Sequence, residues 1–144
     1  MKDLYHLIKY VKLLAAAVYT ADANSATMDL AAYRSCVLQA FIGVNGDTFS
    51  GSVKIELEVE HSDDDSVWSD CADADLLNTV VGTNPGTFAV IDANGETDAL
   101  YQTGYIGSKR YVRVVANFTG THTNGTIVGV SGLQGNAMKH PATL

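Results

Sequence analysis

The chain has 144 residues, a hydrophobic content of 47% and a net charge of -7, which suits one domain with its own core. The excess of acidic residues argues against nucleic-acid binding, because phosphate contacts need clustered Lys and Arg. No stretch approaches the roughly 20 apolar residues that a membrane span requires. The 13 glycines, against 2 prolines, favour short strands joined by tight turns.

The first residues carry an apolar pattern that fits a helical stripe and, almost equally well, an extended arm. In an otherwise β chain we favour an arm, which docks on its own sheet or on an adjacent molecule. Residues 21 to 26 are a polar connector. We therefore expect an arm and connector over residues 1 to 26, a β-sandwich domain over 27 to 135 and a C-terminal tail over 136 to 144.

The first strands of the domain are predicted at residues 27 to 33 and 36 to 44, and the second of these is an apolar run that looks buried on both faces. Asn45 and Gly46 then predict a turn. Residues 53 to 61 alternate strictly, which is typical of a half-buried strand. Its inward set is Val53, Ile55, Leu57 and Val59, and its set facing water is Lys54, Glu56, Glu58 and Glu60.

A turn at residues 62 to 66 places aspartates where they can accept hydrogen bonds from nearby backbone amides. The strand that restarts at Val67 and Trp68 completes a hairpin over residues 53 to about 71. Residues 72 to 84 have no clear pattern. A further strand is expected at 88 to 91.

Residues 104 to 118 predict a buried central strand that is entered through a glycine-rich turn. Its core face is Val112, Val114, Ala116 and Phe118, and its other face is mixed. A turn at 119 to 125 and a strand at 126 to 133 follow. The number and spacing of these strands predict an antiparallel sandwich or barrel, without deciding the topology. Our expectation is an all-β antiparallel β-sandwich, jelly-roll-like, with an extended N-terminal arm.

The residue patterns typical of catalytic and zinc sites are missing from the sequence. The four histidines have no zinc-ligand spacing, and no serine lies in a Gly-x-Ser-x-Gly turn. The acidic cluster of Asp63, Asp64 and Asp65 with Asp70, Asp73 and Asp75 could hold calcium, but it lacks the spacing and the closing glutamate of a calcium-binding loop, so a solvated turn is favoured. We expect no enzyme activity, no metal and no cofactor.

Three other features have two interpretations each. Cys36 and Cys71 are interpreted as free buried thiols, although a bridge between them stays open. Trp68 caps the core edge or lines a sugar-binding platform. The basic cluster of Lys109, Arg110 and Arg113 balances the strand glutamates or contacts an acidic neighbouring subunit.

Two stretches resemble small structural proteins encoded among the head genes of tailed bacteriophages. The first is HSDDDSVWSDC, with its motif at Ser62, Asp63, Asp64, Ser66 and Trp68. The second is GYIGSKRYVRVVANFTGT, with its motif at Gly104, Tyr105, Gly107, Lys109, Arg110, Tyr111, Arg113 and Val114. The opening of the chain also looks like the start of that family, so the resemblance covers most of the sequence.

The resemblance implies a capsid decoration (cement) protein: a β-sandwich made in the host cytoplasm that forms homotrimers on the capsid surface of the virion. Its partners would be the major capsid protein and other copies of itself. The alternatives are a tail or neck component of the virion and a carbohydrate-binding β-sandwich module. The residues expected at the interfaces are Leu4, Leu7, Ile8, Val11, Leu14, Lys109, Arg110 and Arg113.

Overall fold

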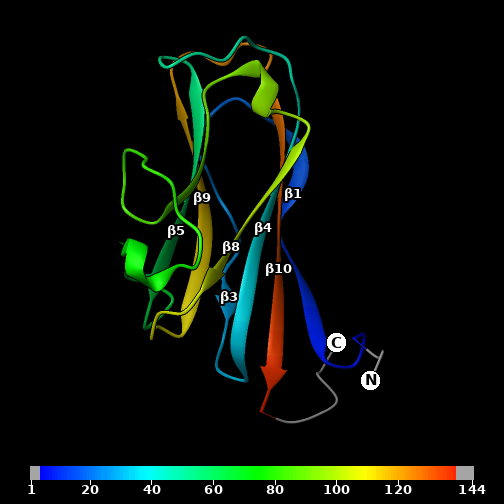
Figure 1. The fold of residues 1–144 in the computed structure, drawn as a ribbon, viewed down its shortest axis with the longest axis vertical. Coiled ribbons are helices and arrows are strands. Elements are labelled where there is room, and N and C mark those ends of the chain that lie inside the picture. Colours follow the sequence, from blue (N-terminus) through cyan, green and yellow to red (C-terminus); the bar gives the residue numbers. More distant parts are fainter. Residues whose placement is uncertain (1–3, 139–144) are drawn as a thin grey trace.

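The computed structural model describes residues 4 to 138 of the chain and consists almost entirely of antiparallel strands (Figure 1). The strands are β1 (Ile8–Tyr19), β2 (Ala23–Asn24), β3 (Met28–Asp29), β4 (Tyr33–Asn45), β5 (Lys54–Ser62), β6 (Ser69–Asp70), β7 (Thr87–Ile91), β8 (Ala99–Tyr105), β9 (Tyr111–Thr119) and β10 (Thr126–Ala137). Two short 3₁₀ turns, η1 (Asp73–Asp75) and η2 (Asn94–Glu96), lie in the connections. Among the described residues, no helix is long and apolar enough to cross a membrane.

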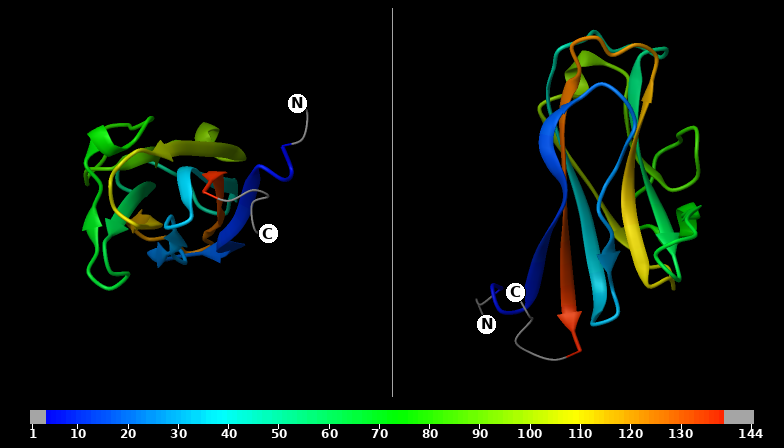
Figure 2. Two further views of the ribbon diagram at one scale, coloured as in Figure 1. Left: turned by 90° about the horizontal axis from the view of Figure 1, so that it is seen from below. Right: turned by 180° about the vertical axis from the view of Figure 1, so that it is seen from behind.

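The strands form two sheets that face each other (Figure 2). Sheet A has the order β1-β10-β4-β8. Sheet B has the order β2-β9-β5-β6, with β3 also paired to β9 and β7 to β5. β1 therefore pairs with β10, β2 and β3 pair with β9, and β4 pairs with β8. This nested pairing is the jelly-roll arrangement, so the predicted fold class is confirmed.

The expected arm is a strand of the sandwich. Residues 8 to 19 form β1, which pairs with β10 from Ile8 opposite Gly135 to Tyr19 opposite Thr126. Of the two expected docking places, the chain's own sheet is the one observed. Leu13 is 4% exposed and belongs to the core. The sandwich therefore begins before residue 27. At the other end Asn136 and Ala137 finish β10, and residues 139 to 144 of the expected tail lie outside the described residues.

The core fills the space between the sheets, and the alternation of β5 and β9 explains which side chains enter it. Leu57 on β5 and Val112 and Val114 on β9 are buried, as predicted. Sheet A contributes Leu38, Ile42 and Val128 from the opposite side. At roughly 1.5 to 3 kcal/mol for each fully buried side chain, this face-to-face burial dominates the stability of the sandwich.

The outer face of β5 differs from the prediction. Glu56 and Glu58 are each 3% exposed, although the alternation placed them in water. The segment between β6 and β7 covers them: Thr83 donates its backbone N–H and its hydroxyl to the Glu56 carboxylate, each at 2.8 Å. Asn84 Nδ2 donates to Glu58 Oε2 at 2.6 Å. This unpatterned connection therefore makes β5 a strand that is buried on both faces.

Candidate interaction surfaces

The hydrophobic residues expected at an interface divide into two groups. Leu4 and Leu7 precede β1 and are exposed, and a turn in which Leu7 N donates to Leu4 O at 3.1 Å holds them together. Val11 and Leu14 lie on β1, half-buried against the core of the chain's own sandwich. Ile8 begins β1 and is also half-buried. Leu4 and Leu7 are therefore the members of this set that are open to a partner.

Lys109 and Arg110 lie in the turn between β8 and β9, and each forms an ion pair within the chain. Lys109 pairs with Asp63 of the β5–β6 hairpin. Arg110 makes a two-point contact with Asp29 on β3, with Nε donating to Oδ1 at 2.9 Å and a terminal nitrogen donating to Oδ2 at 2.8 Å. The hydrogen bond from Arg110 lowers the pKa of Asp29. Both cations therefore fasten this turn to neighbouring elements.

Arg113 lies on β9 directly opposite Glu60 on β5. Its Nε donates to Glu60 Oε2 at 2.6 Å, and its guanidinium carbon lies 4.4 Å from the centre of the Trp68 ring. Arg113 therefore balances the charge of a strand glutamate, which is one of the two interpretations of the basic cluster. One face of the Trp68 ring is covered by the guanidinium, in a cation–π contact.

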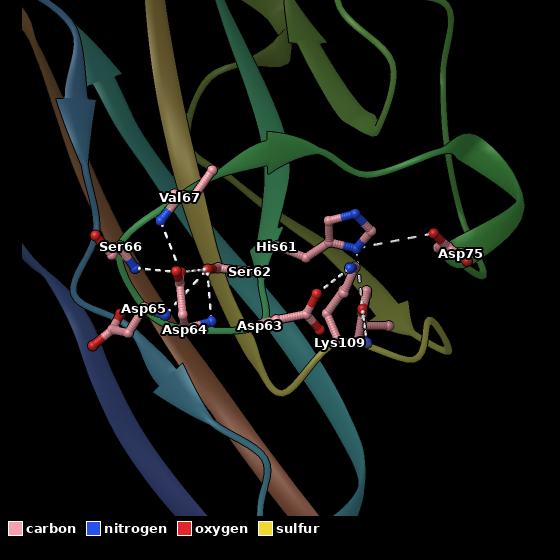
Figure 3. A network of polar contacts seen from close by, with 10 residues as sticks. His61, Ser62, Asp63, Asp64, Asp65, Ser66, Val67, Asp75 and Lys109 are labelled. Atoms are coloured by element: carbon pink, nitrogen blue, oxygen red, sulfur yellow. Dashed lines mark hydrogen bonds and ion pairs between the residues drawn. The ribbon is translucent and has the colours of Figure 1, made fainter.

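The β5–β6 hairpin has the turn chemistry that the sequence predicts (Figure 3). Asp64 Oδ1 accepts hydrogen bonds from the backbone N–H of Val67 at 2.8 Å and of Ser66 at 2.9 Å. The Ser62 hydroxyl also donates to it at 2.9 Å. The backbone bond from Val67 contributes most to lowering the pKa of this carboxyl group. Asp64 is therefore committed to shaping the turn.

A second polar chain joins this hairpin to the turn between β8 and β9 (Figure 3). His61 Nδ1 lies 3.1 Å from the Tyr105 hydroxyl and 3.9 Å from a carboxylate oxygen of Asp75. The backbone N–H of Lys109 donates to the same hydroxyl at 3.0 Å. Burial raises the pKa of Tyr105 to about 12, so the phenol stays protonated and can donate to His61. The two stretches that carry the phage resemblance thus form one packed unit.

Among the described residues, one group of acidic side chains is close enough to share an ion. Glu58, Glu60 and Asp70 have ligand atoms within 4.8 Å of one another, so Asp70 is the member of the predicted acidic cluster that takes part, together with two strand glutamates. Glu60 is ion-paired with Arg113, and Glu58 accepts from Asn84. Burial raises the pKa of Glu58, and the charges of Asp70 and Glu60 add to this. Contacts within the chain therefore hold Glu60 and Glu58 in place on the sheet.

Glu58 gives a prediction for pH dependence. Its pKa is raised in the folded state, so the ionised form destabilises the fold at neutral pH, and this cost disappears below the ordinary Glu range. We expect Glu58→Gln to raise the melting temperature at pH 7, with an advantage over the native chain that shrinks as the pH falls towards 4. Thermal denaturation across this range measures it. Asp92→Asn, an exposed site, is the control, and an equal gain for both variants would contradict the assignment.

The end of the sandwich where β1 and β9 begin has a cavity of about 550 Å³. Its walls include apolar Leu30 and Ile106 together with Arg34, Lys109 and Arg110. Ile106 is 59% exposed, and Arg34 is exposed with no ion pair among residues 4 to 138. Sequence reasoning missed Arg34 and Ile106 because neither belongs to a charged or apolar run. The cavity therefore gathers cations and exposed apolar surface on an acidic molecule.

Both cysteines are free and buried, in agreement with one of the two interpretations of the sequence. Burial raises the pKa of the Cys36 thiol to about 11 and that of Cys71 to about 12. Such thiols carry almost no reactive thiolate at neutral pH. They behave as small hydrophobic residues of the core.

The comparisons with known proteins give a limited result. No family model matches the chain, and no curated protein matches it. Among solved structures, one described as the SPBc2 prophage-derived protein YomS is similar, with a TM-score of 0.42, 13% identity, and coverage of 92% of this chain and 98% of that one. A structure of infectious bursal disease virus, Gx strain, has a TM-score of 0.26 and 13% identity, and the match covers 88% of this chain and 39% of that one. Likenesses this low carry no argument about function.

Proposed function

We propose that this chain is a structural protein of a phage virion that decorates and stabilises the outer surface of the capsid, with the major capsid protein as its partner. In this proposal it is made in the host cytoplasm, assembles as a homotrimer and has no catalytic activity. The proposal rests first on the two stretches that resemble phage head proteins. Their contacts through Lys109, Tyr105 and Arg113 tie them into one unit of the fold.

The observation that carries the proposal furthest is the position of the expected interface residues. The segment before β1 and the turn before β9 are some 100 residues apart in sequence, yet both lie towards one end of the sandwich (Figure 1). Exposed Leu4 and Leu7 belong to the first segment, and Lys109 and Arg110 belong to the second. Because Lys109 and Arg110 already pair with Asp63 and Asp29, this end offers a partner exposed apolar surface with a polar rim.

The mechanism follows from mass action. A ligand that binds the assembled shell, and binds its separated subunits poorly, stabilises the shell by an amount that grows with occupancy. Because the decoration would lie across boundaries between capsid subunits, surface that is buried there resists the outward pressure of packaged DNA. The chain needs no chemistry for this role, only surface that fits.

The copy number of the chain in purified particles tests the proposal. Quantitative mass spectrometry against the major capsid protein should give a ratio near one for a protein that covers the shell. A ratio of a few per cent would instead indicate the tail or neck. Absence from particles would overturn the virion proposal, and a glycan-binding measurement with a Trp68→Ala control would then test the carbohydrate-binding alternative.

A further inference from the structure

The outer face of sheet A, which points away from the core, is apolar and uncovered. The register shows which side chains share it: Phe41 on β4 lies opposite Gly129 on β10 and Leu100 on β8. At the end of β1, Val18 lies opposite Ile127. Phe41 is 43% exposed and Leu100 is 60% exposed. The sequence predicts that residues 36 to 44 are buried on both faces. In the single chain the face towards the core is buried, whereas Phe41 on the outer face is exposed.

The face has a raised part and a hollow part. Phe41 and Leu100 stand beside a groove of about 480 Å³, and Tyr10 on β1 stands on its other side. Ala16 and Gly129 also line the groove. A Cβ atom added at Gly129 would lie only 3.1 Å from the Cβ of Ala16, so the glycine keeps the hollow open. A ridge next to a groove on one face is a self-complementary shape, because a symmetry axis can place the ridge of one copy in the groove of the next.

Charge is distributed unevenly between this sheet and the remainder of the molecule. None of the residues in β1, β4, β8 and β10 is an aspartate or a glutamate, although the chain has 16 of them. With a net charge of -7, two copies repel each other in most orientations. When they meet through sheet A, strands without carboxylates face each other, and Lys12, which lines the groove and is exposed, must keep its ammonium group in water at the rim of the contact. The distribution of the carboxylates is therefore compatible with a second copy at this face.

The exposed apolar area of this face is a large part of what a stable interface buries. Tyr10, Val18, Phe41, Leu100 and Ile127 are each between 38% and 65% exposed. Together they present on the order of 500 Å² of largely apolar surface, which is at the upper end for a monomer and approaches the roughly 800 Å² per partner of a stable interface. The polar residues around them would form the rim.

We propose that the outer face of sheet A is the surface through which copies of this chain associate, with Phe41 and Leu100 of one copy seated in the groove over Ala16 and Gly129 of the next. This surface would hold the copies of the proposed capsid protein together. The inference rests on the proposed function only for the expectation that three copies assemble. It leaves the end near Leu4 and Ile106 free for another partner.

Sedimentation velocity of the full chain over a range of concentrations tests the inference. We expect the native chain to form a dimer or trimer, and Phe41→Asp to weaken this association at least about 100-fold, because it places a charge at the centre of the contact. Leu100→Asp, on the neighbouring strand, should act in the same way and provides a second variant if the first does not fold. Val81→Asp is the matched control, since Val81 is 99% exposed on the connection between β6 and β7. Circular dichroism confirms the fold of each variant.

A native chain that stays monomeric would overturn the inference, as would an oligomer that neither substitution at the face weakens. If the chain is monomeric and Phe41→Asp abolishes its binding to particles, the face belongs to a contact with the shell instead. The two proposals fail separately. An oligomer sensitive to Phe41→Asp but absent from particles supports this surface and removes the virion function.

Discussion

Replacing Leu13 by aspartate should destabilise the sandwich by more than about 4 kcal/mol, because it puts an unpaired charge in the core. Leu13 is the β1 side chain that reaches the core with 4% exposure, and its carbonyl accepts a hydrogen bond from Ala26 N at 2.8 Å. Losing this anchor should release β1 and uncover the edge of β10. Urea denaturation monitored by far-ultraviolet circular dichroism measures the effect.

Ala15→Asp is the matched control, because it puts the same charge at an exposed position of the same strand. It should change stability by less than about 1 kcal/mol. Equal losses for the two variants would show that β1 tolerates no charge anywhere, contrary to the packing described. Deleting residues 1 to 18 would remove Leu13 with the strand, so loss of binding after that deletion would not locate an interface.

Leu57→Ala is the second large effect that we expect, with a loss of about 3 kcal/mol. Leu57 is fully buried in the middle of β5, between Ala116 on β9 and Ala89 on β7. With small residues on both flanking strands, no neighbouring side chain on these strands can fill the vacated space, so a cavity should remain. Thermal unfolding should give a melting temperature lower by about 10 °C.

Val67→Ala serves as the control, since Val67 is 74% exposed in the β5–β6 hairpin. Its melting temperature should stay close to that of the native chain. A Leu57→Ala variant as stable as this control would mean that the two sheets close over the cavity, and the core would then be more plastic than the close packing of β5 indicates.

Local patterns in the sequence predict the strands whose burial follows a simple period. The inward residues of β5 and β9 are found in this way, because one strand face meets the core whatever its partner is. The burial of Glu56 is not found, since the cover over it comes from Thr83, in a connection without a pattern. The same limit applies to β1, whose strand partner is β10 at the far end of the chain.

For the candidate site, too, the sequence predicts the local cluster of residues but not their partners. Sequence predicts the cluster of Lys109, Arg110 and Arg113, but their partners Asp63, Asp29 and Glu60 are set by tertiary structure. The exposed positions of Phe41 and Leu100 were missed for a related reason. An apolar run indicates burial without saying whether the covering surface belongs to the same molecule.

The nested order of the strands also governs how the chain reaches its folded state. β1 is synthesised before the other strands of the sandwich, yet its partner β10 comes after all of them, and Ile8 must find Gly135. Closing so long a loop is entropically costly, and contacts this distant in sequence make folding slow. The sandwich can therefore close only after β10 has been synthesised, and until then β1 exposes apolar surface that a chaperone or a neighbouring chain can cover.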